Sequence, residues 1–402
     1  MRVLLSTESY LPYLSGVTVS VDALARGLGA RGHEVLVLAP RPAGGEAAVP
    51  SGMGSPGPAP RHAWLPSYQL PRPVPPLYRM PVPHPGAAAL REARAFAPDV
   101  VHAHSPFVTG QLARHVARGR GVPLVFTHHT RFGDYGHYLG PLAGPGRRLT
   151  EAYLRRWWAG CDAVIAPSTD LADEIRSRLA GPRRPVVRII PTGVDVDALA
   201  ALAAPDLRAE HGWGSDVVVA ASLGRLAPEK SPMLLLDALA TALRRAPRLR
   251  LCLIGDGPSR EELRRRAAEP DLAGRAAFAG RLPRPEALRM LRGADLFAFA
   301  SRTETQGLVL AEALAAGLPA VAVDGPGVRD SVRDGLDGIV VPHGPREVVV
   351  EALAAALAGL ALDPVRRAAM GARAGADAGR FAVETRVAET EALYVELMGK
   401  GA

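Results

Sequence analysis

Short, almost continuously apolar runs alternate with helical stretches along the first half of the chain. Such runs are typical of parallel strands that are buried on both faces, with helices in the connections between them. A helix is expected over 19–30, where apolar residues recur with helical spacing up to Gly32. Strands are expected over 3–5, 34–39, 100–104, 122–127, 163–166 and 186–190.

The same alternation starts again in the second half of the chain. Strands are expected over 217–221, 249–254, 297–300, 320–323 and 338–341, and helices over 232–245, 260–268, 307–316 and 382–398. The pattern therefore predicts an α/β protein of two doubly wound domains that face each other across a cleft. The domains are expected to span 1–190 and 191–380, and segment 381–402 is expected to cross back to the first domain. In such sheets, ligands bind beyond the carboxyl ends of the strands.

Residues 41–85 interrupt this pattern, with 13 prolines and 5 glycines in 45 positions. Because proline cannot donate to a strand ladder, this segment is expected to be an insertion outside the sheet core. Its second part contains large apolar residues, which indicate that it packs somewhere: Trp64, Tyr68, Leu70, Leu77, Tyr78 and Met80.

The composition is that of a globular protein, since 48% of the 402 residues are hydrophobic and 22% are charged. The two cysteines, Cys161 and Cys252, are too few and too far apart for a disulfide framework or a cysteine-rich zinc site. No uncharged apolar run reaches the roughly 18 residues of a membrane span. Glu8 comes too early for a signal peptide. We therefore expect a cytoplasmic protein.

The net charge of +8 belongs entirely to the first half. Residues 1–190 contain 22 arginines and no lysine against 12 acidic residues, whereas residues 191–402 contain 26 basic and 28 acidic residues. This imbalance suggests an anionic partner for the first domain. The chain carries no RRM, KH, zinc-finger or basic-zipper pattern, so nucleic acid is a disfavoured partner.

Segment 301–316 carries the most informative chemistry. A strand is expected to end at Ala300, and a helix is expected to begin near Thr305. The free N–H groups of a first turn, here around Thr305, Gln306, Gly307 and Leu308, form an anion site. Glu304 and Glu312 lie eight positions apart, a rise of about 12 Å along a helix. Two carboxylates flanking backbone amides suit a nucleotide-sugar. The alternative is that Glu304 caps the helix and Glu312 is merely exposed.

This segment resembles the signature of the retaining family 4 glycosyltransferases of GT-B fold. The resemblance rests on Glu304 and Glu312 and on the sequence that starts at Gly307, Gly-Leu-Val-Leu-Ala-Glu-Ala-Leu-Ala-Ala-Gly-Leu-Pro. The resemblance covers nearly the whole chain. It implies two Rossmann-like domains, with Glu304 on the hydroxyls of the sugar, Glu312 on the ribose, and no cofactor or metal. Four further segments resemble motifs of the family and occur in the same order along the chain: 190–195, 223–230, 253–258 and 278–282.

Two cations, Arg225 and Lys230, lie in the second of these matches and resemble the residues that bind the pyrophosphate of the donor. Cations are also physically suited to the negative charge that develops on a leaving diphosphate. The alternative is a solvated pair at a helix start, where cations are unfavourable. The resemblance also assigns Gly224, Gly255, Arg281 and Leu282 to donor binding.

In the first domain, Gly16 matches the glycine loop of the family, and His129 matches a histidine that contacts the transferred sugar. The alternatives for His129 are a capping residue or a metal pair with His128. Adjacent strand residues point to opposite faces, which disfavours chelation by both. The segment 128–138, with Arg131 and Tyr135, resembles the glycolipid-forming branch similar to 1,2-diacylglycerol 3-glucosyltransferases.

Asp195-Val196-Asp197 has the form of a metal-binding DxD motif, but it lies where the family has its interdomain hinge. We therefore interpret it as structural, and we expect activity without a metal.

Aromatic and basic residues alternate with helical spacing near the end of the first domain, including Arg155, Arg156, Trp157 and Trp158. Such a helix suits the surface of an anionic membrane. The alternative is that both tryptophans are core residues and the arginines form a solvated face.

Together, these features predict a retaining, metal-independent hexosyltransferase that acts on a membrane lipid such as diacylglycerol, with a UDP-hexose as donor. It is expected to be peripheral on the inner face of the plasma membrane. One alternative is a GDP-mannose-dependent mannosyltransferase that acts on a phosphoinositide or another glycan acceptor. Two others are a nucleotide-sugar epimerase of the same fold and a non-catalytic binding protein. The sequence does not indicate an oligomeric state.

Overall fold

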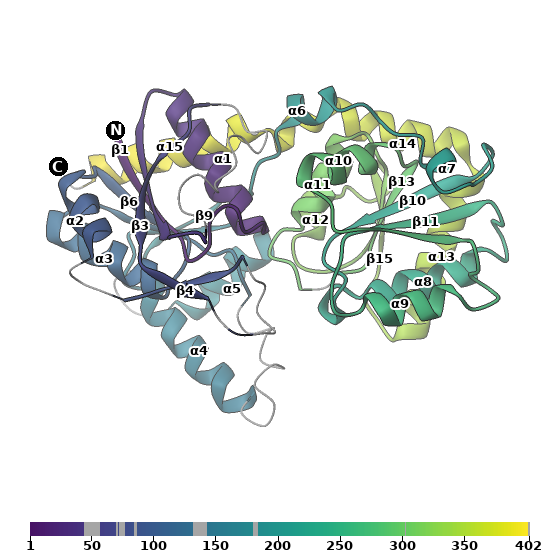
Figure 1. Cartoon of the computed structure of the whole chain (residues 1–402), viewed down its shortest axis with the longest axis horizontal. Coiled ribbons are helices and arrows are strands. Elements are labelled where there is room, and N and C mark those ends of the chain that lie inside the picture. The colour runs from purple at the N-terminus through teal and green to yellow at the C-terminus, as the bar shows by residue number, and fades with distance from the viewer. Residues whose placement is uncertain are drawn as a thin grey trace. The chain divides into compact units, whose positions relative to one another are not determined.

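The computed structural model describes residues 1–43, 57–69, 71, 77–83, 87–131, 143–179, 184–301 and 303–400. The chain forms two compact units, one of Met1–Gly193 with the helix that starts at Val383, and one of Val194–Ala382. The unit boundaries thus lie three and two residues beyond the expected positions 190 and 380. Each unit contains a parallel sheet covered by helices (Figure 1).

The sheet of the first unit has the order β3-β2-β1-β6-β7-β8-β9, with every pair parallel. These strands are β1 (Arg2–Ser6), β2 (Glu34–Pro40), β3 (Arg61–Leu65), β6 (Val100–Ala103), β7 (Leu124–Thr127), β8 (Ala163–Ala166) and β9 (Val186–Ile189). Strand β3 lies inside the proline-rich insertion, within a stretch free of proline, and was not expected. The insertion also forms a two-stranded ribbon of β4 (Ser67–Gln69) and β5 (Arg79–Pro81).

Helices cover both faces of this sheet because successive strand residues point to opposite sides. Val3 and Leu5 pack under α1 (Gly16–Ala30) and α15 (Val383–Gly399). Leu4 belongs to the opposite core. That core is formed with four helices: α2 (Ala88–Ala95), α3 (Val108–Arg120), α4 (Ala143–Trp158) and α5 (Thr169–Arg178).

Trp157 and Trp158 are core residues, each 1% exposed. The guanidinium of Arg114 lies 3.9 Å from the ring centroid of Trp157, and Trp158 Nε1 donates to His128 Nδ1 at 3.1 Å. The prediction that these tryptophans face a membrane is therefore wrong. The end of α4 packs them against the sheet, while Arg155 and Arg156 remain exposed on the other side of the helix.

The sheet of the second unit has the order β12-β11-β10-β13-β14-β15, again entirely parallel. Its strands are β10 (Val218–Leu223), β11 (Leu249–Ile254), β12 (Ala276–Gly280), β13 (Leu296–Phe299), β14 (Ala320–Val323) and β15 (Gly338–Val341). In chain order this is the 3-2-1-4-5-6 arrangement of a Rossmann-type sheet. The order reverses between β10 and β13, so the loops after these two strands lie at the position where such sheets bind ligands.

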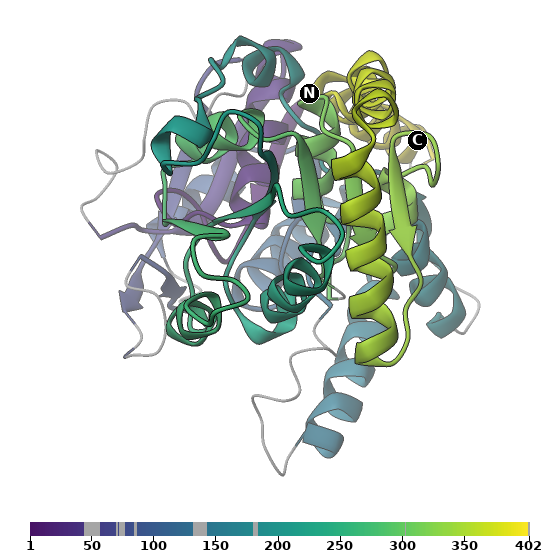
Figure 2. The same cartoon turned by 90° about the vertical axis from the view of Figure 1, so that its right-hand side faces the viewer.

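Helices α8 (Pro232–Ala242), α9 (Arg260–Ala267) and α13 (Arg346–Leu362) cover one face of this sheet. Figure 2 shows α13 lying along the sheet beside β15. The other face packs against α6 (Val196–Ala201), α10 (Arg284–Arg292), α11 (Leu308–Ala315), α12 (Val328–Ser331) and α14 (Pro364–Ala376). Three short elements complete the unit among the described residues: α7 (Leu207–Glu210) and the 3-10 helices η3 (Pro228–Lys230) and η4 (Ala378–Phe381).

No single helix in the described part of the chain has the length and apolar character needed to cross a bilayer. The pair α13 and α14 meets those criteria only jointly, and it is bent by 98°. Leu353 and Leu357 of α13 are buried in the core of the second unit.

Candidate functional site

Lys230 and Glu304 meet at the topological switch point of the second unit. Lys230 ends η3 after β10, and Glu304 follows β13. Lys230 Nζ donates to Glu304 Oε1 at 2.5 Å, although the residues are 74 positions apart in the chain. Both side chains remain partly exposed, at 25% and 22%. Two residues predicted to bind the donor from different motifs therefore form one charged pair at the ligand-binding edge of the sheet.

Helix α11 begins at Leu308, so the expectation of a start near Thr305 is wrong. Gly307 is the N-cap with a φ of +74°, and no side chain caps the helix. A left-handed backbone at Gly307 breaks the helical path, which places Thr305 and Gln306 in the preceding turn. The first-turn N–H groups of the anion site therefore lie from Leu308 onward. Glu304 is not a capping residue, because it pairs with Lys230 instead.

Glu312 is fully buried in α11, which contradicts the alternative of a merely exposed helix residue. Its Oε1 accepts a hydrogen bond from Arg284 Nη2 at the start of α10, and its Oε2 has no hydrogen-bond partner in the described part of the chain. A buried carboxylate oxygen without a donor is costly, and a hydroxyl of a bound ligand would satisfy it. Arg284 was missed in the sequence, although it lies two residues after the predicted Leu282.

Glycines allow the loops after β10 and β11 to pack backbone against backbone. Gly255 has a φ of +139°, and a Cβ there would lie 1.9 Å from the carbonyl oxygen of Gly224. Arg225 follows Gly224, with a largely exposed side chain whose Nη1 is 3.6 Å from Glu229 Oε1. The side chain of Glu229 is only 6% exposed, and this residue was not singled out in the sequence. Arg281 and Leu282 follow β12, with Arg281 exposed and Leu282 half-buried.

Histidines gather beyond the carboxyl ends of β6 and β7 in the first unit. His129 Nε2 lies 2.8 Å from His104 Nδ1. Burial lowers the pKa of His129 to about 4, so the ring is neutral at pH 7. His128 instead bonds to Trp158 of α4, and no group of three or more potential metal ligands occurs among the described residues. His104 was not among the predicted site residues, although His102-Ala103-His104 closes a predicted strand.

The other residues predicted for the site in the first unit are Gly16, Arg131 and Tyr135. Gly16 is the first residue of α1, next to the N-cap Ser15, and a Cβ at Gly16 would meet no atom within 4 Å. Arg131 Nη2 lies 3.1 Å from Glu174 Oε2 on α5, so Arg131 has an ion-pair partner within its own unit. Tyr135 lies outside the described residues. Glu8, which was not predicted, accepts from the backbone N–H of Thr109 at 2.8 Å, and burial raises its pKa.

The DxD segment forms the start of helix α6. Asp195 is the N-cap of α6, and its Oδ1 accepts a hydrogen bond from the backbone N–H of Ala198 at 2.9 Å. Asp197 lies in the first turn of the same helix, where an acidic residue is favourable.

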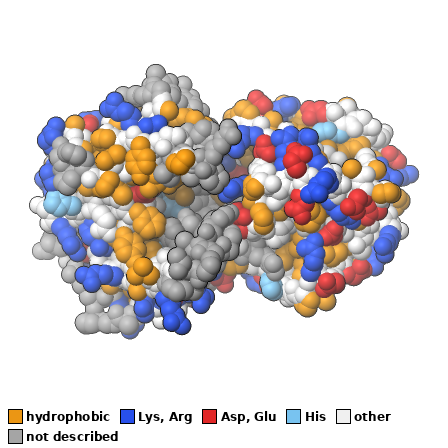
Figure 3. All heavy atoms as spheres, turned by 60° about the horizontal axis from the view of Figure 1, so that its bottom comes forward, with side chains coloured by type: hydrophobic (Ala, Val, Ile, Leu, Met, Phe, Trp, Pro, Cys, Tyr) orange, Lys and Arg blue, Asp and Glu red, His pale blue; other side chains and the backbone are white. Residues whose placement is uncertain are grey.

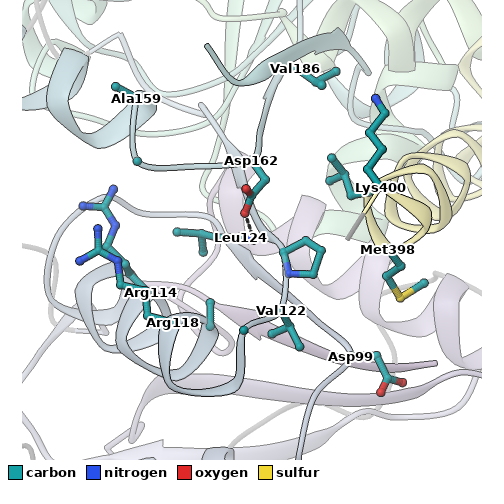
Figure 4. A pocket seen from close by; sticks show the side chains of 15 residues that line it. Asp99, Arg114, Arg118, Val122, Leu124, Ala159, Asp162, Val186, Met398 and Lys400 are labelled. Atoms are coloured by element: carbon teal, nitrogen blue, oxygen red, sulfur yellow. Dashed lines mark hydrogen bonds between the residues drawn. The ribbon is translucent and has the colours of Figure 1, made fainter. Parts of the chain in front are cut away.

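A cavity of about 830 Å³ lies at the amino ends of strands in the first sheet, opposite to the carboxyl ends that carry the histidines (Figure 4). Its lining includes Asp162 and Val186, at the amino ends of β8 and β9, and Arg118 of α3. Asp162 Oδ2 already accepts a hydrogen bond from the backbone N–H of Leu124 at 2.9 Å. None of the predicted site residues that the structure describes lines this cavity, so it is separate from the histidines at the carboxyl ends of the same sheet.

The fold and the site together define a class of protein, an α/β chain of two parallel-sheet domains with a charged pair at the carboxyl edge of a Rossmann-type sheet. The family model for Glycosyltransferase Family 4 matches residues 14–198, and that for glycosyl transferases group 1 matches residues 204–376. The chain belongs to the family 4 glycosyltransferases and has their GT-B fold of two Rossmann-like domains.

Curated relatives and solved structures cover nearly the full chain. The alpha-monoglucosyldiacylglycerol synthase of Acholeplasma laidlawii is 30% identical over 413 residues, covering 100% of this chain and 98% of the relative. The GDP-mannose-dependent alpha-mannosyltransferase of Mycobacterium tuberculosis is 32% identical over 350 residues, covering 86% and 85%. The crystal structure of Anabaena HepE with UDP has a TM-score of 0.74 at 20% identity, covering 99% of this chain and 100% of HepE. HepE has also been solved with UDP-glucose.

Proposed function

We propose that this glycosyltransferase moves a hexose from a UDP-sugar to a membrane lipid such as diacylglycerol, with retention of the anomeric configuration. The observation that carries the proposal is the convergence of Lys230 and Glu304 at the switch point. Lys230 offers a cation suited to a diphosphate, and Glu304, next to it, offers a carboxylate suited to the hydroxyls of a sugar. The likeness to glucosyldiacylglycerol synthases supports the lipid acceptor, and the UDP complexes of HepE support the donor base.

The chemistry follows from the charges of these groups. The bond between the sugar and the diphosphate breaks, the acceptor hydroxyl bonds to the anomeric carbon on the same face, and its proton passes to the leaving diphosphate. Lys230, Arg225 and the first turn of α11 stabilise the charge that develops on the diphosphate. We assign the sugar hydroxyls to Glu304, the ribose to the buried Oε2 of Glu312, and contact with the transferred sugar to His129, following the family resemblance.

A donor and acceptor panel tests this proposal. UDP-glucose, UDP-galactose and GDP-mannose would each be incubated with and without diacylglycerol vesicles, and free nucleoside diphosphate would be measured. We expect UDP release that depends on diacylglycerol and is unchanged by EDTA. Conversion of the sugar without an acceptor would indicate an epimerase, and loss of activity in EDTA would contradict metal independence.

A second candidate is a GDP-mannose-dependent mannosyltransferase. The 32% identity to the mycobacterial enzyme favours it. In the same panel, this candidate predicts GDP release with a phosphoinositide acceptor and no turnover of UDP-sugars.

We also propose that α4 contacts an anionic membrane through its exposed arginines, which are Arg147, Arg148, Arg155 and Arg156. Leu149, next to them, is 74% exposed. Figure 3 shows basic and hydrophobic side chains interspersed on the visible face of the first unit. The first half of the chain also carries the whole positive excess.

Liposome flotation tests this contact at low salt with phosphatidylglycerol and with neutral vesicles. We expect Arg155→Gln/Arg156→Gln to weaken binding to anionic vesicles roughly tenfold or more, since each cation near such a surface contributes about 1 kcal/mol. Arg265→Gln/Arg366→Gln removes the same charge from exposed positions of the second unit and serves as the control. Equal recovery of the wild type with both kinds of vesicle would exclude the membrane role.

A further inference from the structure

A continuous set of polar side chains connects helix α15 to His129 within the first unit. Tyr394 of α15 is fully buried, and its hydroxyl lies 2.6 Å from His102 Nδ1. His102 Nε2 lies 2.7 Å from Thr127 Oγ1. The ring of His102 packs on that of His104 with centroids 4.2 Å apart, and His104 Nδ1 reaches His129 Nε2 at 2.8 Å. The position of the His129 ring is therefore set by buried neighbours on one side.

His104 has one ring nitrogen whose requirement is not met by any described protein group. Its Nε2 is buried and has no hydrogen-bond partner among the residues that the structure describes, and the residue is 5% exposed. His104 lines a cavity of about 40 Å³ between α1, α15 and the strand ends. That volume exceeds the roughly 10–15 Å³ that one water molecule needs. The described lining also offers polar groups for such a water: Ser20, Thr127, Thr192, Arg386 and Thr390.

The donor groups of this cavity favour one protonation pattern. None of the described lining residues is acidic, and the charge of Arg386 is paired with Glu389 at 2.8 Å outside the lining. Because a guanidinium offers only N–H donors, a water molecule that accepts from Arg386 can donate to His104 Nε2, which then acts as an acceptor. A neutral histidine carries its proton on one nitrogen only. With Nε2 as acceptor, the proton of His104 lies on Nδ1 and is donated to His129 Nε2.

We propose that His104 is a positioning residue that donates from Nδ1 to His129 Nε2 and thereby fixes His129 with its own proton on Nδ1. The functional part of this inference rests on the proposed role of His129 at the transferred sugar. In that role, a fixed Nδ1–H gives His129 a defined donor for a sugar hydroxyl. Tyr394 bonds to His102, and the ring of His102 packs on that of His104, so α15 contributes to the geometry of His129 through these two rings.

The neutral state of these rings supports this assignment. Burial lowers the pKa of His102 to about 3 and that of His129 to about 4. Near pH 7, the question for His129 is therefore which nitrogen holds the single proton. A hydrogen bond contributes about 1 kcal/mol, which is enough to select one tautomer several-fold over the other.

Nitrogen-15 NMR of histidine-labelled protein tests the tautomer directly, without substrate. We expect the wild type to show His129 protonated on Nδ1, and His104→Leu to show a mixture of tautomers. His104→Asn can keep a donor near the Nδ1 position and should restore the wild-type pattern. His115→Gln, at an exposed position of α3, should leave the His129 signals unchanged. A wild-type His129 protonated on Nε2 would overturn the proposal even if His104→Leu failed to fold.

Kinetics provide the second measurement. We expect His104→Leu to lower kcat about tenfold with little change in KM for the donor, and His104→Asn to recover most of the loss. An unchanged kcat in His104→Leu would overturn the positioning role. Absence of transferase activity in the wild type would instead contradict the proposed function, while the NMR result on the tautomer would still stand.

Discussion

Lys230→Ala should lower kcat by roughly 10²- to 10³-fold while the protein stays folded, because a preorganised charge at the leaving group is among the largest catalytic contributions. The ammonium group lies at the carboxyl edge of the second sheet, 2.5 Å from Glu304, and it is partly open to a ligand. Removing it would leave the leaving diphosphate without a point charge and Glu304 without its cation. The hydrophobic core is untouched, since Lys230 is not buried.

The chain offers an unusually clean control for this experiment, because its only other lysine is Lys400. Lys400 is 60% exposed and pairs with Glu396 on the surface of α15. Lys400→Ala should retain wild-type kcat, and Lys230→Arg should retain part of it, since a guanidinium keeps the charge but not its compact shape. Circular dichroism and thermal unfolding would verify folding. A near-normal kcat in Lys230→Ala would refute the assignment of the site.

Most strands were predictable because both faces of each sheet are buried, which requires continuous apolar runs such as Val3-Leu4-Leu5. Two strands of the large sheets lacked that pattern. Strand β3 begins with two polar residues at the edge of its sheet, and β12, at the edge of the other sheet, consists mostly of small residues that are half-buried. An edge strand needs only one paired neighbour and one buried face, so its sequence carries a weaker signal.

The residues of the candidate site were predictable individually, but their contacts were not. Lys230 and Glu304 meet because β10 and β13 are neighbours in the sheet, and that strand order is a tertiary property. The partner of Glu312 comes from α10, 28 positions earlier in the chain. The helical spacing around Trp157 placed aromatic and basic groups on one helix, but it did not show which side packs on the sheet.

Buried neutral histidines should make the first unit sensitive to acid. Burial lowers the pKa of His102 and His128 to about 3 and that of His129 to about 4, and it lowers the pKa of His104 as well. In the unfolded chain, a histidine titrates near pH 6.5. Between these values, the unfolded state binds more protons than the folded state. The stabilisation that the neutral histidines give to the folded state is therefore complete above about pH 6.5, and it is lost progressively as the pH falls toward 4.

The expected decrease in the free energy of unfolding is large because several histidines act together. Each buried histidine lowers the free energy of unfolding by up to about 1.4 kcal/mol per pH unit in this window, so four should remove several kcal/mol between pH 7 and pH 5. In the second unit, His343 is exposed and His211 is half-buried, so neither of its two histidines is fully buried like those of the first unit. Acid should therefore unfold the first unit before the second.

Urea unfolding of a Trp213→Phe variant measures this effect, because the remaining tryptophans, Trp64, Trp157 and Trp158, all lie in the first unit. Fluorescence then reports that unit alone. His102→Gln should reduce the pH dependence of the free energy of unfolding by close to one proton, whereas the exposed His115→Gln should leave it unchanged. If the free energy of unfolding were constant from pH 7 to pH 5, the histidines would have to be hydrated in the folded state. The neutral tautomer inferred for His129 would then lose its physical basis.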